Sequence, residues 1–179
     1  EGWVARQEFY GIVWRGRKEL IQLARRFGID EIPSPSTGCS LTERRFSKKV
    51  FDLIQLDEQA GRWDFELLSV GRHYRLDAQT KVIVGRHAED NARLEYMHTL
   101  PEAGSALLLK PAGFPGPTAL LIGASSKENT RRAAGLIVRH AGQEKAAGGV
   151  IEVAQGNQTS TVPAVSNKEV ESLPTIASS

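Results

Sequence analysis

The sequence is poor in cysteine and in long apolar runs. Its single cysteine, Cys39, excludes an internal disulfide and a zinc site built from several thiolates. The longest apolar runs, 106–109 and 119–122, are as short as a strand, whereas a membrane-spanning helix needs roughly 20 apolar residues. We therefore expect a protein of a reducing, cytoplasmic compartment with no membrane partner.

The sequence also lacks the short motifs of several enzyme classes. It contains no glycine-rich phosphate loop followed by Lys-Ser or Lys-Thr, no Ser-Gly-Gly nucleotide loop, no His-Glu-x-x-His and no Gly-x-Ser-x-Gly. The histidines do not have the spacing of metal ligands; they are His73, His87, His98 and His140. We therefore expect this chain to hold no cofactor and no metal, and not to catalyse a reaction by itself.

The composition is that of an ordinary soluble protein. Of the 179 residues, 40% are hydrophobic and 25% are charged, which leaves room for one ordinary domain or two small ones. The net charge of +2 indicates little about partners. Because Glu1-Gly2-Trp3 contains no initiator methionine and begins no secretion signal, we expect the chain to be a piece of a longer protein.

The first 60 residues have a helical period. The apolar residues of 17–27 fall on one helical face, and Gly28 follows at the position of a left-handed cap. A second helix, capped by Thr42, is predicted to end near residue 56. The polar run 57–61 then indicates a linker, so we place a domain boundary near residue 60. The apolar face of the second helix consists of Phe46, Val50, Leu53 and Ile54.

After residue 60 the period changes from 3.6 to 2, which favours strands. We expect strands at 63–67, 72–76, 81–84, 105–110 and 118–122, the last two paired antiparallel. Helices are expected at 88–97 and 126–141, the second opening with a capping box of Ser125 and Glu128. The predicted fold class over 61–145 is α+β, a small mixed or antiparallel sheet with flanking helices.

The last segment, 146–179, is rich in small and polar residues. Only 150–153 has the pattern of a strand, and no aromatic residue follows it. Because so little apolar surface cannot offset the entropy of ordering the chain, we predict a flexible tail over 146–179.

Two copies of Val-Gly-Arg-His carry the clearest local signal, at 70–73 and 84–87. Each copy sets a permissive glycine beside a guanidinium and an imidazole, which are groups suited to a phosphate. Arg86 lies just before the start of a predicted helix, where free N–H groups favour anions. The alternative is that the glycines serve turns and that the Arg and His side chains lie on the surface.

Basic residues cluster on two predicted helices. Arg44, Arg45, Lys48 and Lys49 are expected on the far side of the second helix from its apolar face, and Lys127, Arg131, Arg132, Arg139 and His140 lie on the last helix. Both sets can follow a phosphate backbone, although charge runs on helices are often only solvated faces.

Cys39 lies in a loop just before a helix rich in arginine and lysine. The helix N-terminus and these cations would stabilise a thiolate, which predicts a reactive thiol and, as one alternative, an independent thiol enzyme. The other interpretation is that Cys39 is a small buried hydrophobic residue, as a lone cysteine often is.

The first block of the sequence resembles the end of a PP-loop tRNA thiouridine synthase. Ser36-Thr37-Gly38-Cys39, followed by Glu43-Arg44 and Phe46, is similar to the second cysteine loop of tRNA 2-thiouridylases. The resemblance implies that 1–60 is the C-terminal remnant of a PP-loop domain and that Cys39 is a sulfur-carrying or intermediate-forming thiol, with a persulfide donor or another carrier as the source of the sulfur. The family's adenylating loop would lie upstream, so ATP is expected to bind there and not to this chain. Other matching segments are Gly16-Arg17-Lys18, Gln22-Leu23-Ala24, Phe27-Gly28-Ile29 and Pro33-Ser34-Pro35.

The second block resembles the RNA-binding domain of the NFACT family, which bacterial proteins join to a PP-loop enzyme. Val84-Gly85-Arg86, Asn91, Leu94 and the strand from Gly104 to Leu109 carry this resemblance. It implies that the chain binds tRNA, and not DNA, for an ATP-dependent thiolation. The predicted RNA contacts are Arg44, Arg45, Lys48, Lys49, Arg72, His73, Arg86, His87, Asn91, Lys127, Arg131 and Arg132. The alternative is a protein-interaction module whose basic helices dock an acidic partner or the missing catalytic domain.

Overall fold

The computed structural model describes residues 10, 17–32 and 39–178, which form two compact units, Glu1–Gly38 and Cys39–Ser179. In the first unit, α1 (Arg17–Arg26) confirms the predicted helix, and Gly28 has a φ of 72°, as the predicted left-handed cap requires. The ring of Phe27 contacts that of Tyr10 edge to face, with centroids 5.8 Å apart. Most of the loop predicted before Cys39, residues 33–38, lies outside the described residues.

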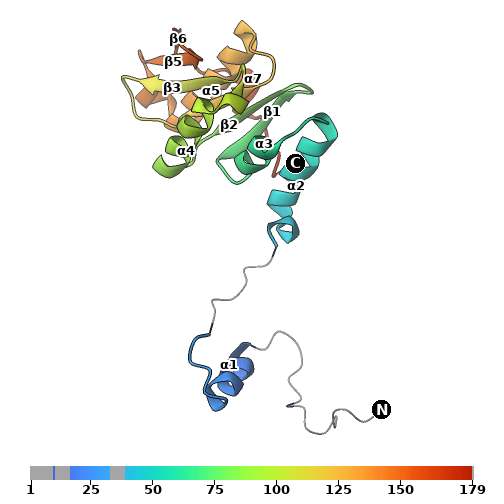
Figure 1. The fold of residues 1–179 in the computed structure, drawn as a ribbon. Coiled ribbons are helices and arrows are strands. Elements are labelled where there is room, and N and C mark those ends of the chain that lie inside the picture. Colours follow the sequence, from blue (N-terminus) through green and yellow to red (C-terminus); the bar gives the residue numbers. More distant parts are fainter. Residues whose placement is uncertain (1–9, 11–16, 33–38, 179) are drawn as a thin grey trace. The chain divides into compact units, whose positions relative to one another are not determined.

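The second unit is an antiparallel sheet with helices on both faces (Figure 1). The strand order is β1-β2-β4-β3-β5-β6, and every neighbouring pair is antiparallel, which confirms the α+β prediction. The elements are α2 (Arg44–Leu56), α3 (Arg62–Leu67), β1 (Arg72–Asp77), β2 (Thr80–Val84), α4 (Ala88–Thr99), β3 (Leu107–Ala112), β4 (Ala119–Ile122), α5 (Lys127–Ala141), α6 (Gln143–Ala146), β5 (Val150–Gln155), β6 (Gln158–Pro163) and α7 (Lys168–Glu171). Short 3₁₀ turns lie at Ser40–Thr42 and Pro101–Ala103.

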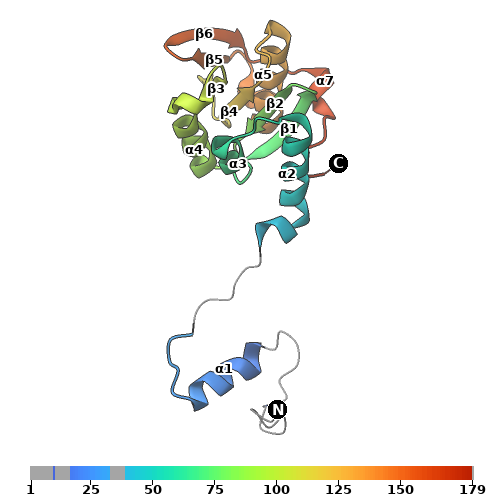
Figure 2. The same ribbon diagram turned by 45° about the vertical axis from the view of Figure 1, so that its right-hand side comes forward.

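Side-chain alternation along the strands builds one core on each face of the sheet. Leu107 and Leu109 of β3 pack with α5, while Leu108 between them packs with α3 and α4. Every residue of β2, the second strand of the sheet, is buried. Figure 2 shows α2 beside β1, where Arg75 of β1 forms an ion pair with Asp52 of α2.

The segment predicted as a strand at 63–67 is the helix α3. Trp63 and Leu67 are both buried on one face of this helix, and the Trp63 Nε1–H donates to the carbonyl of Met97 at 2.9 Å. Phe65 between them is 41% exposed. The apolar residues 63, 65 and 67 have the spacing of a strand, but over so short a window residues 63 and 67 also fit an i, i+4 pair on a helix. The packing of this segment against α4 selects the helix.

The predicted flexible tail is wrong, because 146–178 completes the sheet. β5 pairs with β3, and β6 pairs with β5. Ile151 and Val153 of β5 and Val170 of α7 are buried in the core beside α5. A strand that adds to an existing sheet edge needs only half of its side chains to be apolar, so the overall composition of the segment was a poor guide.

Residues 39–60 belong to the second unit, so the division falls at residue 38 and not near residue 60. Two caps also differ from the prediction. Glu43 caps α2 in place of Thr42, since its carboxylate accepts from the amides of Arg45 and Phe46. Ser126 caps α5 in place of Ser125 and accepts from the amide of Asn129 at 3.1 Å.

Candidate functional site

The two Val-Gly-Arg-His copies meet at the open end of the β1–β2 hairpin, where Arg72 is paired with Val84. Both glycines are required there. Gly71 has a φ of +65°, and a Cβ on it would lie 2.6 Å from the carbonyl oxygen of Val84. A Cβ on Gly85 would lie 2.0 Å from Oδ1 of Asn91. The hairpin therefore holds Arg72 and Arg86 at the same end of the two strands.

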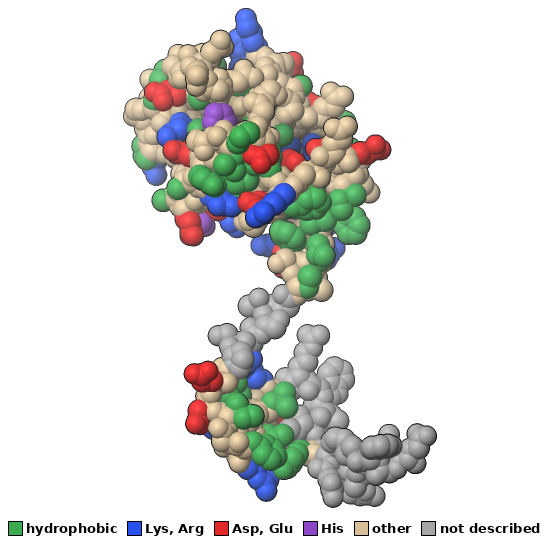
Figure 3. Space-filling view, viewed as in Figure 1, with side chains coloured by type: hydrophobic (Ala, Val, Ile, Leu, Met, Phe, Trp, Pro, Cys, Tyr) green, Lys and Arg blue, Asp and Glu red, His purple; other side chains and the backbone are tan. Residues whose placement is uncertain are grey.

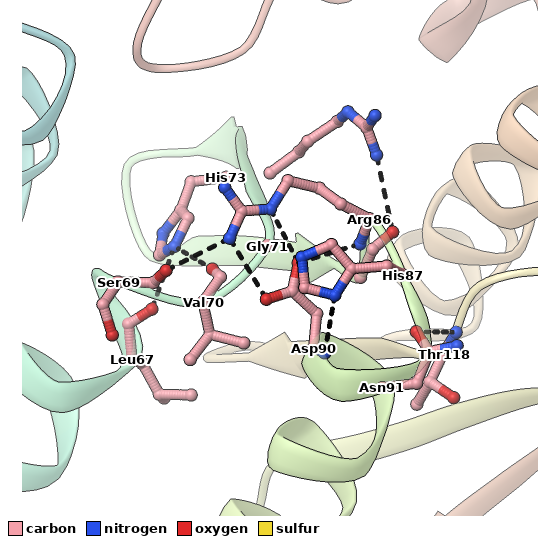
Figure 4. A network of polar contacts seen from close by, with 12 residues as sticks. Leu67, Ser69, Val70, Gly71, His73, Arg86, His87, Asp90, Asn91 and Thr118 are labelled. Atoms are coloured by element: carbon pink, nitrogen blue, oxygen red, sulfur yellow. Dashed lines mark hydrogen bonds and ion pairs between the residues drawn. The ribbon is translucent and has the colours of Figure 1, made fainter.

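Arg86 forms an ion pair with Asp90 at the start of α4 (Figure 4). Its Nε donates to one carboxylate oxygen at 2.7 Å and a terminal nitrogen donates to the other at 3.1 Å. Burial alone would raise the pKa of Asp90, but the hydrogen bonds from Arg86 outweigh it and the pKa is lowered. The hydrogen bonds to Asp90 also raise the pKa of Arg86. Arg86 thus stabilises the fold locally, with part of its side chain still on the surface.

His87 and Asn91 have positioning roles beside this pair. His87 is the N-cap of α4, where its Nδ1 accepts from the amide of Asp90 at 3.4 Å, and its ring remains about half exposed. The Oδ1 of Asn91 accepts from the amide of Thr118 at 3.1 Å, which ties α4 to the start of β4. Of these two predicted contacts, His87 offers the more accessible side chain.

His73 cannot contact an RNA, which corrects the prediction. Its side chain is buried under α3, and its Nε2 lies 2.9 Å from the carbonyl of Val70 and 3.1 Å from that of Leu67. Burial, together with the nearby Lys49 and Lys81, lowers the pKa of His73 well below its ordinary value. The ring is therefore neutral and buried, whereas the neighbouring Arg72 is partly exposed at the end of β1.

Arg72 lines a cavity of about 390 Å³ between the start of α4, the loop 115–117 and the end of α5. Its side chain donates to the carbonyl of Gly85 at 3.5 Å and forms no ion pair with any residue that the structure describes. None of the described residues that line the cavity is acidic. The basic and imidazole side chains on its wall are Arg72, Arg86, His87, His140 and Lys145.

His140 contributes a neutral polar group to this wall. Its Nε2 forms a hydrogen bond with the Tyr74 hydroxyl at 2.7 Å. Burial, followed by the charges of Arg72 and Arg139, lowers the pKa of His140 to about 4. His140 therefore adds no positive charge to this cavity at neutral pH.

A second cavity, of about 720 Å³, lies on the other side of Arg72 and Arg86, between α2 and residues 175–178. Arg45 and Lys49 line it, as does the N-cap Glu43. The Nζ of Lys49 donates to the carbonyl of Leu68 at 2.8 Å, and burial together with the charge of Arg86 lowers the pKa of Lys49 to about 8. Because both cavities share Arg72 and Arg86, we call them together the basic cleft.

The other predicted basic residues do not continue the cleft into one track. Arg44 is exposed and Lys48 lines a separate cavity with Phe51 and Asp52, so the four basic residues of α2 do not share a solvated face. Lys127 and Arg131 lie near the start of α5, at the opposite end from His140. Arg132 is mostly buried, and its Nε pairs with Glu169 at 3.4 Å.

Cys39 is exposed and precedes the 3₁₀ turn Ser40–Thr42. It does not line the basic cleft. Sequence reasoning missed Lys145, because a single lysine in an Ala-Gly-rich segment gives no signal, and it did not connect the proline-glycine loop 115–117 with the site. Within the described residues, no group of three or more His, Cys, Asp or Glu side chains could hold a metal ion. None of the described helices is both long and apolar enough to cross a membrane.

Comparisons with known proteins identify the family. The C-terminal part of the fibronectin/fibrinogen-binding protein from Streptococcus suis is similar to this chain at 12% identity and a TM-score of 0.46, over 86% of this chain and 72% of that one. A search of curated proteins finds no match. The sequence model of the NFACT protein RNA binding domain matches residues 71–173, which include most of the basic cleft and all six strands. The chain therefore belongs to the family of NFACT RNA-binding domains.

Proposed function

We propose that this RNA-binding domain holds tRNA in the basic cleft. The observation that carries the proposal is the cavity beside Arg72, whose described lining includes two arginines and a lysine and no carboxylate. Most other arginines of the described sheet domain are paired with carboxylates, including Arg75, Arg86, Arg93 and Arg132. Among the described residues, Arg72 and Arg45 are the guanidinium groups of the cleft without a carboxylate partner, and Arg72, which lines both cavities, is the better suited to bind a phosphate.

The electrostatics of the cleft favour an anion. Lys49, Arg72 and Arg86 lie around one opening, and the charge of Arg86 contributes to the lowered pKa of Lys49. A phosphate between these cations would relieve their repulsion and raise the pKa of Lys49 towards its ordinary value. Phosphate contacts of this kind fix the position of an RNA without reading its sequence. The cleft is thus suited to the backbone of a folded RNA.

The finer proposal is that the bound tRNA is presented for thiolation of a uridine in the cytoplasm. A PP-loop domain, in the same or another polypeptide, would bind ATP and activate the uridine, and a persulfide donor would supply the sulfur. Cys39, exposed at the start of the sheet domain, would be the sulfur carrier. The support for this step is the resemblance of Ser36-Thr37-Gly38-Cys39 and the neighbouring residues to the thiouridylase cysteine loop.

The test is a fluorescence-anisotropy titration of the chain with bulk tRNA and with a DNA duplex at several salt concentrations. We expect salt-dependent binding that prefers tRNA. R72Q should weaken tRNA binding and reduce the slope of log K against log salt by about 1, because one phosphate contact is lost. The control R62Q removes an exposed arginine of α3 outside the cleft and should leave the slope unchanged. Equal affinity and slope for R72Q and the unmodified chain would refute the proposal.

A second candidate function is favoured by the surface of α2. Hydrophobic side chains gather over this helix in Figure 3, and Phe51 and Ile54 are 65% and 55% exposed. A helix face of this kind is suited to docking a protein, such as the catalytic domain. In the same titration this candidate predicts no binding of tRNA, and F51S should then weaken capture of a purified PP-loop domain.

A further inference from the structure

A groove of about 790 Å³ lies between the first half of α5 and the β5–β6 hairpin, away from the basic cleft. Its apolar lining includes Leu107, Val153 and Val162. Ser160 pairs with Val153 and Gln158 pairs with Gln155, which places hydroxyl and amide groups along the same strands. We call it the α5–β6 groove. Its volume is in the range of sites that enclose a small ligand.

Two cations stand on the α5 side of this groove. Lys127 and Arg131 are one helical turn apart, both are exposed, and both line it. Neither side chain makes an ion pair or a hydrogen bond with another residue in the part of the chain that the structure describes. The described lining of the groove contains no carboxylate either. The groove therefore offers two unneutralised cations to a ligand.

The combination of groups is that of a nucleotide site. An apolar surface accepts the face of a base, amide and hydroxyl groups of Gln158 and Ser160 can bond its edge, and Lys127 and Arg131 can bind its phosphates. An acidic peptide would also meet these cations. However, an extended peptide that adds to β6 would use the backbone edge of that strand, whereas the groove extends from β6 to α5 and includes Lys127 and Arg131 of that helix. The lining therefore favours RNA.

The groove and the basic cleft lie at opposite ends of one helix. Lys127 lines the groove and His140 lines the cleft, and thirteen residues of α5 separate them by about 20 Å at 1.5 Å per residue. One RNA can therefore contact both sites, with its backbone in the cleft and a single-stranded end in the groove.

We propose that the α5–β6 groove binds an unpaired nucleotide of the RNA, with Lys127 and Arg131 on its phosphates and Gln158 on the edge of its base. The proposal rests on the proposed function, because it assigns a second contact to the RNA that the basic cleft holds. It explains why these two cations lie outside the cleft, although the sequence placed them on the same surface.

The experiment compares an RNA hairpin with a blunt end and the same hairpin with a single-stranded 3′ overhang of a few nucleotides, by fluorescence anisotropy with the full chain. We expect the overhang to increase affinity about tenfold, as base contacts in single-stranded RNA sites do. K127Q/R131Q should abolish this increase and still bind the blunt hairpin. Q158A should reduce the increase and change its dependence on the overhang base.

The two proposals fail in different ways. R72Q should weaken the binding of both RNA hairpins by the same factor. If R72Q changes neither affinity, the cleft proposal is wrong, and the overhang preference still tests the groove. The nucleotide proposal is overturned if the unmodified chain binds both hairpins equally, or if the preference survives in K127Q/R131Q. An acidic protein segment would be the occupant instead if the overhang adds no affinity while a labelled poly-glutamate peptide binds the unmodified chain and not K127Q/R131Q. Thermal unfolding of each variant checks that the fold is kept. We expect the same melting temperature as for the unmodified chain, because the side chains of Lys127, Arg131 and Gln158 are exposed.

Discussion

The guanidinium of Arg86 and the carboxylate of Asp90 form a two-point ion pair, and the Arg86 backbone amide donates to the same carboxylate at 3.0 Å. The Asp90 side chain is 7% exposed, so its carboxylate is nearly enclosed between the end of β2 and the start of α4, while 43% of the Arg86 side chain is exposed (Figure 4). Arg72, the matching residue of the other Val-Gly-Arg-His copy, has no such partner among the described residues. The two copies are therefore alike in sequence and different in role.

The first prediction follows from this difference. R86A leaves the carboxylate of Asp90 buried without its main partner, and we expect it to lower the free energy of unfolding by about 2 kcal/mol. R72A removes an unpaired arginine and should change it by less than about 0.5 kcal/mol. Urea unfolding followed by circular dichroism measures both variants. If R86A were as stable as R72A, the assignment of Arg86 to the fold would be wrong.

The second prediction concerns Gly85, whose missing side chain admits the amide of Asn91. G85A would place a methyl group 2.0 Å from the Asn91 Oδ1, so Asn91 must move and lose its hydrogen bond to the Thr118 amide. We expect a loss of about 1–3 kcal/mol and weaker RNA binding, because α4 and the loop 115–117 shift together. The matched control is G61A, where nothing lies within 4 Å of the new methyl group. Equal melting temperatures for G85A and G61A would contradict this prediction.

The strands of the sheet could be predicted because each is a short run of β-forming residues between turn residues. β1, β2, β3, β4 and the start of β5 lie close to the ranges expected from sequence. The helix α3 could not be predicted, since Trp63 and Leu67 fit both periods and only the hydrogen bond to Met97 and the packing on α4 select one. β6 was missed for a similar reason, because its partner β5 has to be in place before its polar residues can pair.

The candidate site was predictable in its location and not in its details. The two glycine-arginine pairs pointed to the hairpin end, and the register of β1 with β2 brings them together. Asp90, four residues after Arg86, was the available sign that this arginine would be paired on the helix. His73 was selected for its residue type, but β1 is covered on both faces, so His73 and Tyr74 are both buried, whereas Arg72 at the strand end is partly exposed. Sequence distance gave no indication that Lys145 joins the same cavity.

The third prediction is a loss of stability in mild acid. His73 and His140 both have a lowered pKa in the folded chain, that of His140 to about 4, mainly through burial. Below the ordinary pKa of about 6.5 the unfolded chain takes up protons that the folded chain does not, so the free energy of unfolding falls as the pH drops from 6.5 towards 4. Urea unfolding at a series of pH values measures this slope.

H140Q should reduce that slope while keeping a polar partner for the Tyr74 hydroxyl. Y74F is the control, because it removes the hydrogen bond and leaves the imidazole in place, so its slope should stay steep. A slope in H140Q equal to that of the unmodified chain would show that His140 does not contribute to acid sensitivity.

The fourth prediction links RNA binding to protons through Lys49. In the free chain, burial and then the charge of Arg86 lower the pKa of Lys49 to about 8, so this lysine loses its charge as the pH rises through 8. Between pH 8 and the ordinary value of 10.5 the unfolded chain binds the extra proton, so the stability of the fold rises with pH over this window. RNA affinity should change in the opposite direction, because a phosphate in the cleft requires the charged lysine.

Anisotropy titrations with tRNA between pH 7 and pH 8.5 should therefore show affinity falling as the pH rises, with uptake of a fraction of a proton on binding. K49R keeps a positive charge throughout this range and should flatten the pH dependence while it retains affinity at pH 7. K49M should flatten it at low affinity, because it mimics the neutral lysine at every pH. A pH dependence that is unchanged in both variants would place the titrating group outside the cleft and remove Lys49 from the RNA contacts.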